Sequence, residues 1–307
     1  MPSLDPRPLT LDHDFMHSAV SVRVPATSAN LGPGFDCLGL ALDLWGTITL
    51  ERREPSGGGD DPMAGMAELA ARRVFERAGQ EAGPLAASYE GEIPIARGLG
   101  ASAVARVGGL VAANELAGQP LDRDDLLAIA TDLEGHADNV APALFGGLQV
   151  SVVEGDRVLH TAVPLPAGLK AVLFVPEFRI ATKDARRVLP SMLSRADAVH
   201  NIGRAALLVA AMARGRFDLL NAATQDRLHQ PPRASLFPAM TAIFEAARAA
   251  GAHAAYLSGS GSTICALATA NPQGIADAMA EAGRAREVAG QTIITAPTDR
   301  GAEVVED

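Results

Sequence analysis

The chain has 307 residues, of which 48% are hydrophobic and 20% charged, the composition of a folded protein long enough for two domains. A formal net charge of −10 argues against binding to nucleic acid or to an anionic membrane, so we expect neither partner. The two cysteines, Cys37 and Cys265, are too few for a disulfide framework and favour a reducing, cytoplasmic location.

The first residues do not resemble a targeting segment. Residues 1–18 contain prolines and acids where a signal peptide has an apolar stretch, so we predict a flexible tail, with Met16 as an alternative start. A glycine-rich segment at 57–61 predicts a turn or mobile loop. We place the two domains at 19–165 and 166–307, with the boundary near Pro164.

The first domain mixes strand and helix patterns. Val20, Val22 and Val24 alternate with polar residues, and the leucines from 38 to 44 alternate in the same way, which predicts two strands. Further strands are expected at 87–93, 148–153 and 158–163. Helices are expected at 63–82, 100–116 and 123–133, the last of them capped by Asp122.

The second domain begins with an apolar run at 170–175, which predicts a strand. Helices are expected at 183–189, 196–214, 235–250 and 272–285, and strands at 253–257, 263–268 and 291–296. This order of elements predicts a ferredoxin-like, split βαβ unit of the α+β class.

A glycine-rich segment from Pro94 to Ala103 joins a predicted strand to a predicted helix. Glycines let the backbone approach a phosphate, and the free N–H groups at a helix start favour an anion. Ser102 adds an oxygen that suits Mg²⁺. Close packing of the helix explains the glycines equally simply. The lysine-containing phosphate loop and the dinucleotide-binding glycine pattern are both absent from the sequence.

A second polar segment, from Glu134 to Asn139, follows a predicted helix. A zinc site is one interpretation, although spacing identifies no third ligand. A helix terminus capped by Asp138 or Asn139 is another. The segments 28–36 and 258–262, taken singly, are glycine-containing hairpin loops.

Together the four segments resemble, in order and rough spacing, the motifs of the GHMP kinases, small-molecule kinases named for galactose, homoserine, mevalonate and phosphomevalonate. Residues 94–103 resemble the central motif Pro-x-x-x-Gly-Leu-Gly-Ser-Ser-Ala, residues 30–36 the first motif and residues 258–263 the third. Further signatures at 134–142 and 182–186, with Arg233, are most similar to the branch that phosphorylates homoserine.

The resemblance implies a two-domain GHMP-kinase fold, whose N-terminal domain is mixed α/β with the phosphate loop before a helix. It implies ATP and Mg²⁺ as cofactors, L-homoserine as the substrate, O-phospho-L-homoserine for threonine biosynthesis as the product, and a homodimer. Metal binding is implied for Ser102 and Glu134, and nucleotide binding for Pro94, Arg97, Gly98, Leu99, Gly100, Ala101, Ser102 and Ala103. Substrate binding is implied for Asn30, Asp36, His136, Asn139, Thr182, Arg186, Arg233, Gly259 and Gly261, and catalysis for Asn139, Arg186 and His136.

Two residues depart from the motifs: Ala101 stands where a serine is frequent, and Ser262 where a proline is frequent. Relatives that act on mevalonate or galactose carry an acidic general base at the position of Asn139, and an amide cannot accept that proton. Catalysis would then rest on alignment and electrostatic stabilisation, with His136 as the fallback base. The alternatives are a kinase for a mevalonate-like acid or an isoprenoid alcohol, and a catalytically silent nucleotide-binding regulator.

Overall fold

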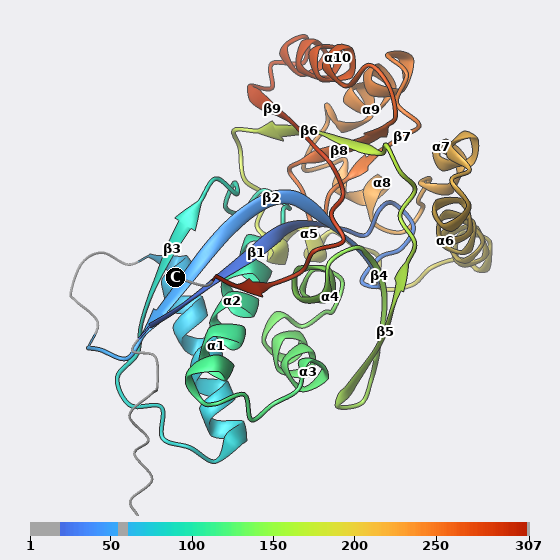
Figure 1. Ribbon diagram of the computed structural model, residues 1–307. Coiled ribbons are helices and arrows are strands. Elements are labelled where there is room, and N and C mark those ends of the chain that lie inside the picture. The colour runs from blue at the N-terminus through green and yellow to red at the C-terminus, as the bar shows by residue number, and fades with distance from the viewer. Residues whose placement is uncertain (1–18, 55–60, 306–307) are drawn as a thin grey trace, which may run out of the picture.

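The computed structural model describes residues 19–54 and 61–305. The tail predicted at 1–18 lies outside these residues, as does most of the loop predicted at 57–61. Figure 1 shows two layered units side by side, with the N-terminal elements in blue to green and the C-terminal elements in yellow to red.

The first unit is built on a six-stranded sheet with the order β10-β1-β2-β4-β5, in which β3 pairs with β2. Helices cover one face of this sheet (Figure 1). The strands are β1 (Ala19–Ala29), β2 (Leu38–Glu51), β3 (Ala86–Gly91), β4 (Leu148–Glu154), β5 (Arg157–Val163) and β10 (Glu303–Val304). The helices are α1 (Pro62–Ala78), α2 (Ala101–Leu116), α3 (Arg123–Glu134) and α4 (Val140–Phe145).

The second unit is a four-stranded antiparallel sheet with the order β7-β8-β6-β9. Its strands are β6 (Lys170–Pro176), β7 (Ala254–Leu257), β8 (Ile264–Ala268) and β9 (Gly290–Thr295). Its helices are α5 (Thr182–Arg187), α6 (Arg195–Arg214), α7 (Leu220–Ala223), α8 (Gln230–Arg233), α9 (Met240–Ala249) and α10 (Pro272–Arg284), with a 3₁₀ turn at Phe217–Leu219. This strand order is that of a ferredoxin-like unit, so the predicted fold class is confirmed.

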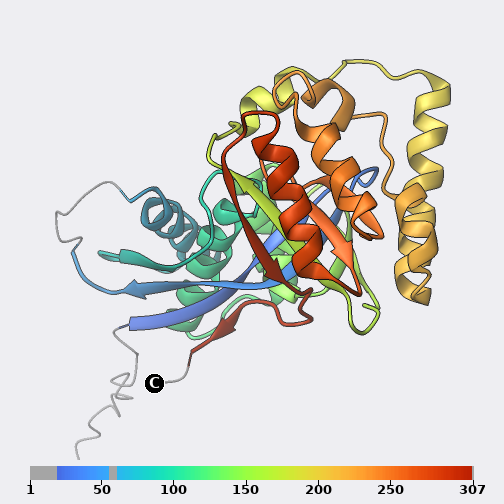
Figure 2. The same cartoon turned by 90° about the horizontal axis from the view of Figure 1, so that it is seen from above.

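The second sheet is buried on both faces. Ala171 and Leu173 of β6 belong to a core that continues into the first unit, whereas Val172 and Phe174 pack with residues of α9 and α10. A strand covered on both sides needs no polar alternation, which explains the continuous apolar run that predicted β6. Figure 2 shows α9 and α10, in orange and red, on the outer side of this sheet. The two units therefore share a hydrophobic core.

The helix predicted at 235–250 is wrong over its first turn, since α9 begins at Met240. Pro238 lacks an N–H group and disfavours a helical conformation at Phe237, so residues 235–239 form turns. The short helices α4, α7 and α8 were not predicted, because four to six residues are too few for a periodic pattern.

The last described residues return to the first sheet. Val304 pairs with Val22 of β1, and the Asp43 N–H donates to the Ala296 carbonyl at 2.8 Å. The domain boundary at residue 165 stays a prediction. After β9, however, the chain leaves the second unit and adds β10 to the sheet of the first unit. Among the described residues, no helix has the length and apolar character to cross a membrane.

Candidate active site

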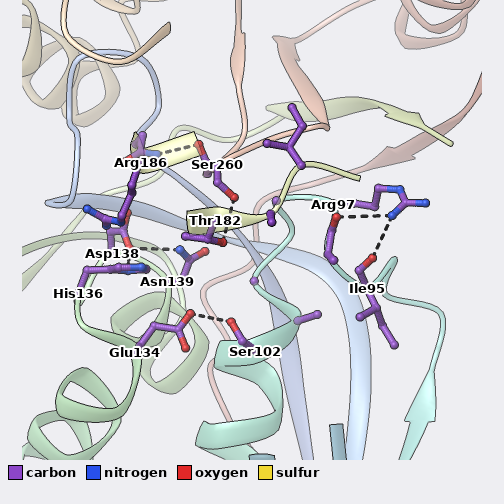
Figure 3. Close-up of a pocket in the computed structure, with 18 of the residues that line it drawn as sticks. Ile95, Arg97, Ser102, Glu134, His136, Asp138, Asn139, Thr182, Arg186 and Ser260 are labelled. Carbon is purple, nitrogen blue, oxygen red and sulfur yellow. Dashed lines mark hydrogen bonds and ion pairs between the residues drawn. The ribbon is translucent and has the colours of Figure 1, made fainter. Parts of the chain in front are cut away.

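A cleft of about 230 Å³ lies where the two units meet. Its walls come from the β1–β2 turn, α1, the loop before α2, the α3–α4 loop, α5, α8 and the β7–β8 loop. Figure 3 shows side chains from several of these elements pointing into one space. The lining residues are Asn30, Phe35, Asp36, Met63, Met66, Ile95, Ala96, Arg97, Gly98, Gly100, Ala101, Ser102, Glu134, His136, Asp138, Asn139, Ile180, Ala181, Thr182, Arg186, Arg233, Gly259 and Ser260.

The loop before α2 presents backbone to this cleft. Gly98 and Gly100 have φ values of +77° and +69°, in the left-handed region that glycine tolerates. Gly100 caps α2 without a side-chain hydrogen bond, so the first N–H groups of the helix lack a capping acceptor. A helix start of this kind suits an anion.

The three glycine-containing segments are hydrogen-bonded to one another. Ser258 Oγ donates to the Gly98 carbonyl at 2.6 Å, and the Thr27 N–H donates to the Leu99 carbonyl at 3.2 Å. The Gly259 N–H donates to the Ala29 carbonyl at 3.0 Å. A Cβ on Gly98 would lie 2.2 Å from the Ser258 carbonyl oxygen, so this contact requires glycine.

Ser102 and Glu134 face each other across the cleft from the start of α2 and the end of α3 (Figure 3). Ser102 Oγ donates to Glu134 Oε1 at 2.6 Å, and Arg106 forms an ion pair with the same carboxylate. Burial lowers the pKa of Arg106, but the guanidinium stays charged at neutral pH. A hydroxyl and a carboxylate are the hard oxygen donors that Mg²⁺ prefers alongside phosphate oxygens, so this pair fits that ion.

His136, Asp138 and Asn139 form a chain of hydrogen bonds beside this pair. His136 Nδ1 lies 2.7 Å from Asp138 Oδ1, and Asn139 Nδ2 donates to the same oxygen at 3.1 Å. Asn139 Oδ1 accepts from Thr27 Oγ1 at 2.8 Å, which fixes the amide. No side chain caps α4 at Asn139, so the expectation of a simple helix cap is wrong.

Arg186 and Asp36 form a bidentate ion pair at the other end of the cleft. Nη1 lies 3.0 Å from Oδ2 and Nη2 lies 2.7 Å from Oδ1. The Arg186 guanidinium also lies 5.4 Å from the centre of the Phe35 ring. The pair holds a cation and an anion side by side within reach of a ligand.

Arg233 approaches the same Phe35 ring, at 5.5 Å, but no carboxylate of residues 19–54 or 61–305 forms an ion pair with it. Its side chain donates to the carbonyls of Ala185 and Gly259, at 3.2 and 3.0 Å, and to His229 Nδ1 at 2.9 Å. Burial, and then the charge of Arg186, lower the pKa of Arg233 to about 10. Arg233 is therefore a buried cation held by neutral acceptors.

The structure brings most of the predicted site residues together. The exceptions are Pro94, Leu99, Ala103 and Gly261, which do not line the cleft. Leu99 and Ala103 are core residues, and Pro94 borders a neighbouring hollow. Arg97 lines the cleft at its edge, where it also donates to the Pro176 carbonyl at 2.9 Å.

Other lining residues were not predicted. Phe35, Asp138 and Ser260 stand inside recognised motifs, so their neighbours offered a signal for them. Met63 and Met66 of α1 offered none, because a methionine in a helix is ordinarily a core residue. In the part of the chain that the structure describes, no three His, Cys, Asp or Glu side chains could share a metal ion, so nothing supports the zinc interpretation.

Comparison with known proteins gives the same family as the motifs. The family model described as GHMP kinases N terminal domain matches residues 50–147, and the model described as GHMP kinases C terminal matches residues 208–285. The chain belongs to the GHMP kinase family.

Individual relatives cover most or nearly all of this kinase. It is 44% identical to a homoserine kinase from Moorella thermoacetica, over 92% of this chain and 99% of the relative. It is 51% identical to a homoserine kinase from Symbiobacterium thermophilum, over 71% and 74% of the two chains. A crystal structure of homoserine kinase from Cytophaga hutchinsonii superposes with a TM-score of 0.85 at 31% identity, covering 94% of this chain and 98% of the other.

Proposed function

We propose that this kinase transfers the γ-phosphoryl group of ATP to the side-chain hydroxyl of L-homoserine, forming O-phospho-L-homoserine. The observation that carries the proposal is the acceptor end of the cleft, where Arg186, Arg233 and Asp36 converge around Phe35. A guanidinium binds a carboxylate in bidentate fashion, and a carboxylate binds an ammonium group. The site therefore suits an α-amino acid.

The buried state of Arg233 strengthens this argument. Only 2% of the residue is exposed, and its hydrogen-bond partners are carbonyls and an imidazole. Asp36, Asp226 and Asp138 attract the guanidinium, but among the described residues no carboxylate is paired with it directly. A buried cation without a counter-ion is costly. A substrate carboxylate would provide that counter-ion. A neutral sugar or an isoprenoid alcohol would not.

At the other end, the backbone N–H groups of Gly98 to Ser102 would bind the ATP phosphates. Ser102 and Glu134 would hold Mg²⁺, which would supply positive charge to neutralise the phosphates. Arg106 orients Glu134 through its ion pair.

In this proposal Asn139 would orient the attacking hydroxyl but would not deprotonate it. Its Oδ1 is held by Thr27 and its Nδ2 by Asp138, so the amide has a fixed direction. His136, held by Asp138, lines the same cleft and is the fallback group that would take a proton. We expect catalysis to depend on alignment and on charge neutralisation.

The test is release of ADP from Mg·ATP with L-homoserine, mevalonate, galactose and no acceptor in parallel. Turnover with homoserine alone supports the proposal. Turnover with mevalonate or galactose would indicate another acceptor class within the family. ATP binding without turnover on any acceptor would favour a regulatory role.

A further inference from the structure

His229 is a fully buried histidine, with 0% of its surface exposed, that does not line the cleft but contacts two of its walls. Its Nε2 lies 2.7 Å from the carbonyl oxygen of Gly32 in the β1–β2 turn. Its Nδ1 lies 2.9 Å from Nη1 of Arg233 in α8. The imidazole therefore joins the turn that carries Asp36 to the buried substrate arginine.

These two partners determine which ring nitrogen carries the hydrogen. A carbonyl oxygen only accepts and a guanidinium only donates, so Nε2 is protonated and Nδ1 holds a lone pair. Burial lowers the pKa of His229 to about 4, which favours the same neutral form. The charged groups around it are Asp226, Arg233 and Asp36.

The hydrogen bonds through His229 close a ring. The Gly259 carbonyl accepts from Arg233 Nη1 at 3.0 Å and from Asn30 Nδ2 at 2.9 Å. Asn30 Oδ1 in turn accepts the backbone N–H of Asp36 at 3.0 Å. These hydrogen bonds fix the first motif, the third motif and α8 relative to one another. His229 takes part in them without lining the cleft itself.

The backbone on both sides of His229 is also held tightly. Asp226 accepts the N–H groups of His229 and Gln230, at 2.9 and 2.6 Å. A Cβ on Gly32 would lie 2.1 Å from the Thr224 carbonyl oxygen, so the turn rests directly on the segment before α8. The backbone that precedes Arg233 is therefore fixed, and the hydrogen bonds of its guanidinium fix the direction of the side chain.

We propose that His229 is a positioning residue, which holds the Arg233 guanidinium at a fixed separation from the turn that carries Asp36. Among the residues that the structure describes, no hydrogen-bond partner is found for Arg233 Nη2. That nitrogen is therefore available to the carboxylate of the substrate. The inference rests on the proposed function, because a fixed separation matters for an acceptor with both a carboxylate and an ammonium group.

Three variants test it: His229→Leu, His229→Asn and His229→Gln. Leucine removes both hydrogen bonds. Asparagine places an acceptor near the position of Nδ1, whereas glutamine places a donor near that of Nε2. Each variant is assayed with L-homoserine and with 2-amino-1,4-butanediol, which has the ammonium and hydroxyl groups but no carboxylate.

For His229→Leu we expect the KM for homoserine to rise roughly tenfold or more, the effect of losing a buried hydrogen-bond partner of a charged group. The KM for ATP and the kcat/KM for the aminodiol should stay within about twofold of the parent. His229→Asn should retain more of the homoserine affinity than His229→Gln. An equal loss on both acceptors, or no loss at all, overturns the positioning role.

The leucine variant leaves the buried Arg233 guanidinium without one hydrogen-bond acceptor, so it can fail to fold. In that case the comparison of His229→Asn with His229→Gln tests the positioning role. Failure of the unaltered kinase to phosphorylate homoserine would overturn the proposed function instead. A measurement that does not depend on turnover is the ring ¹⁵N NMR spectrum of His229 in the free protein. A protonated Nε2 with an unprotonated Nδ1 supports the inference, and the opposite tautomer overturns it.

Discussion

At the phosphate end of the cleft the proposed anion-binding groups are backbone N–H donors at the start of α2, whereas at the acceptor end they are the guanidinium groups of Arg186 and Arg233. The two ends also differ in how they are supported. Gly98 leaves no room for a Cβ beside Ser258, while Arg233 is held by carbonyls and by His229. Backbone donors recognise a phosphate whatever the acceptor is. Side chains can be exchanged by substitution, so we expect specificity for the substrate to reside at the acceptor end.

The two arginines differ in their burial and in how their charges are compensated. In the Arg186 pair with Asp36, the side chains are 38% and 35% exposed, so the charge is already compensated and solvent can screen it. Arg233 is buried, and within the described part of the chain no carboxylate forms an ion pair with it. An amino acid would bring an ammonium group to Asp36 and a carboxylate to both arginines. The ion pair would then be exchanged for new ones at small net cost.

The largest effect is expected from Glu134→Gln at the phosphate end. The amide keeps the shape but loses the charge for Mg²⁺ and for Arg106, so kcat should fall about 10²–10³-fold and the Mg²⁺ requirement should rise. Rates across a range of Mg²⁺ concentrations measure this. Asp132→Asn is the control, because Asp132 lies on the same helix with 68% of its side chain exposed. Equal behaviour of the two variants would contradict the assignment of Glu134.

Gly98→Ala tests whether the backbone conformation of the loop before α2 is what binds the phosphates. The new Cβ would lie 2.2 Å from the Ser258 carbonyl oxygen, and alanine is strained at φ +77°. Displacement of the loop should lower kcat/KM for ATP roughly 10²-fold. The matched control is Gly203→Ala in α6, where a Cβ meets nothing within 4 Å. Unchanged ATP kinetics in Gly98→Ala would remove the phosphate loop from the proposal.

Arg186→Ala tests the acceptor end. It should raise the KM for homoserine about tenfold and leave the KM for ATP nearly unchanged, because the lost group is partly exposed but bidentate. Arg187→Ala in the same helix removes an arginine that is 74% exposed and pairs with Asp184. Steady-state kinetics with each substrate varied distinguish the two ends. A parallel rise in both KM values would mean that Arg186 supports the whole cleft.

The last effect is on stability and leaves the kinetic comparison aside: a pH dependence that comes from His229. Its folded-state pKa of about 4 lies below the ordinary 6.5, so the unfolded chain binds more protons between these values. The contribution to the free energy of unfolding is complete above pH 6.5 and is lost as the pH falls toward 4. It amounts to at most about 3 kcal/mol. Denaturant titrations at pH 7 and pH 5 should show a smaller decrease for His229→Asn than for the unaltered protein.

Much of the fold follows from local patterns in the sequence. The helices α2, α3 and α6 and the strands β4 to β8 stand close to their predicted positions, because their apolar periods and caps are local properties. The motifs are equally local, so their resemblance to those of the family is enough to predict Ser102, Glu134, Asp36 and Arg186 as site residues. The start of α9 was misplaced and β10 missed, since a proline and a two-residue strand leave little periodic signal.

Only the tertiary structure decided which of these residues meet. Both guanidinium groups lie over the Phe35 ring, and the Gly259 carbonyl accepts from both Asn30 and Arg233. Phe35 and Asn30 come from the β1–β2 turn, far along the chain from α5, α8 and the β7–β8 loop. His229 has no motif of its own in the sequence, and its importance lies in the Gly32 carbonyl on one side and Arg233 on the other. Sequence patterns record which groups a segment offers. Burial and long-range hydrogen bonds, which depend on how distant segments pack, determine what each group does.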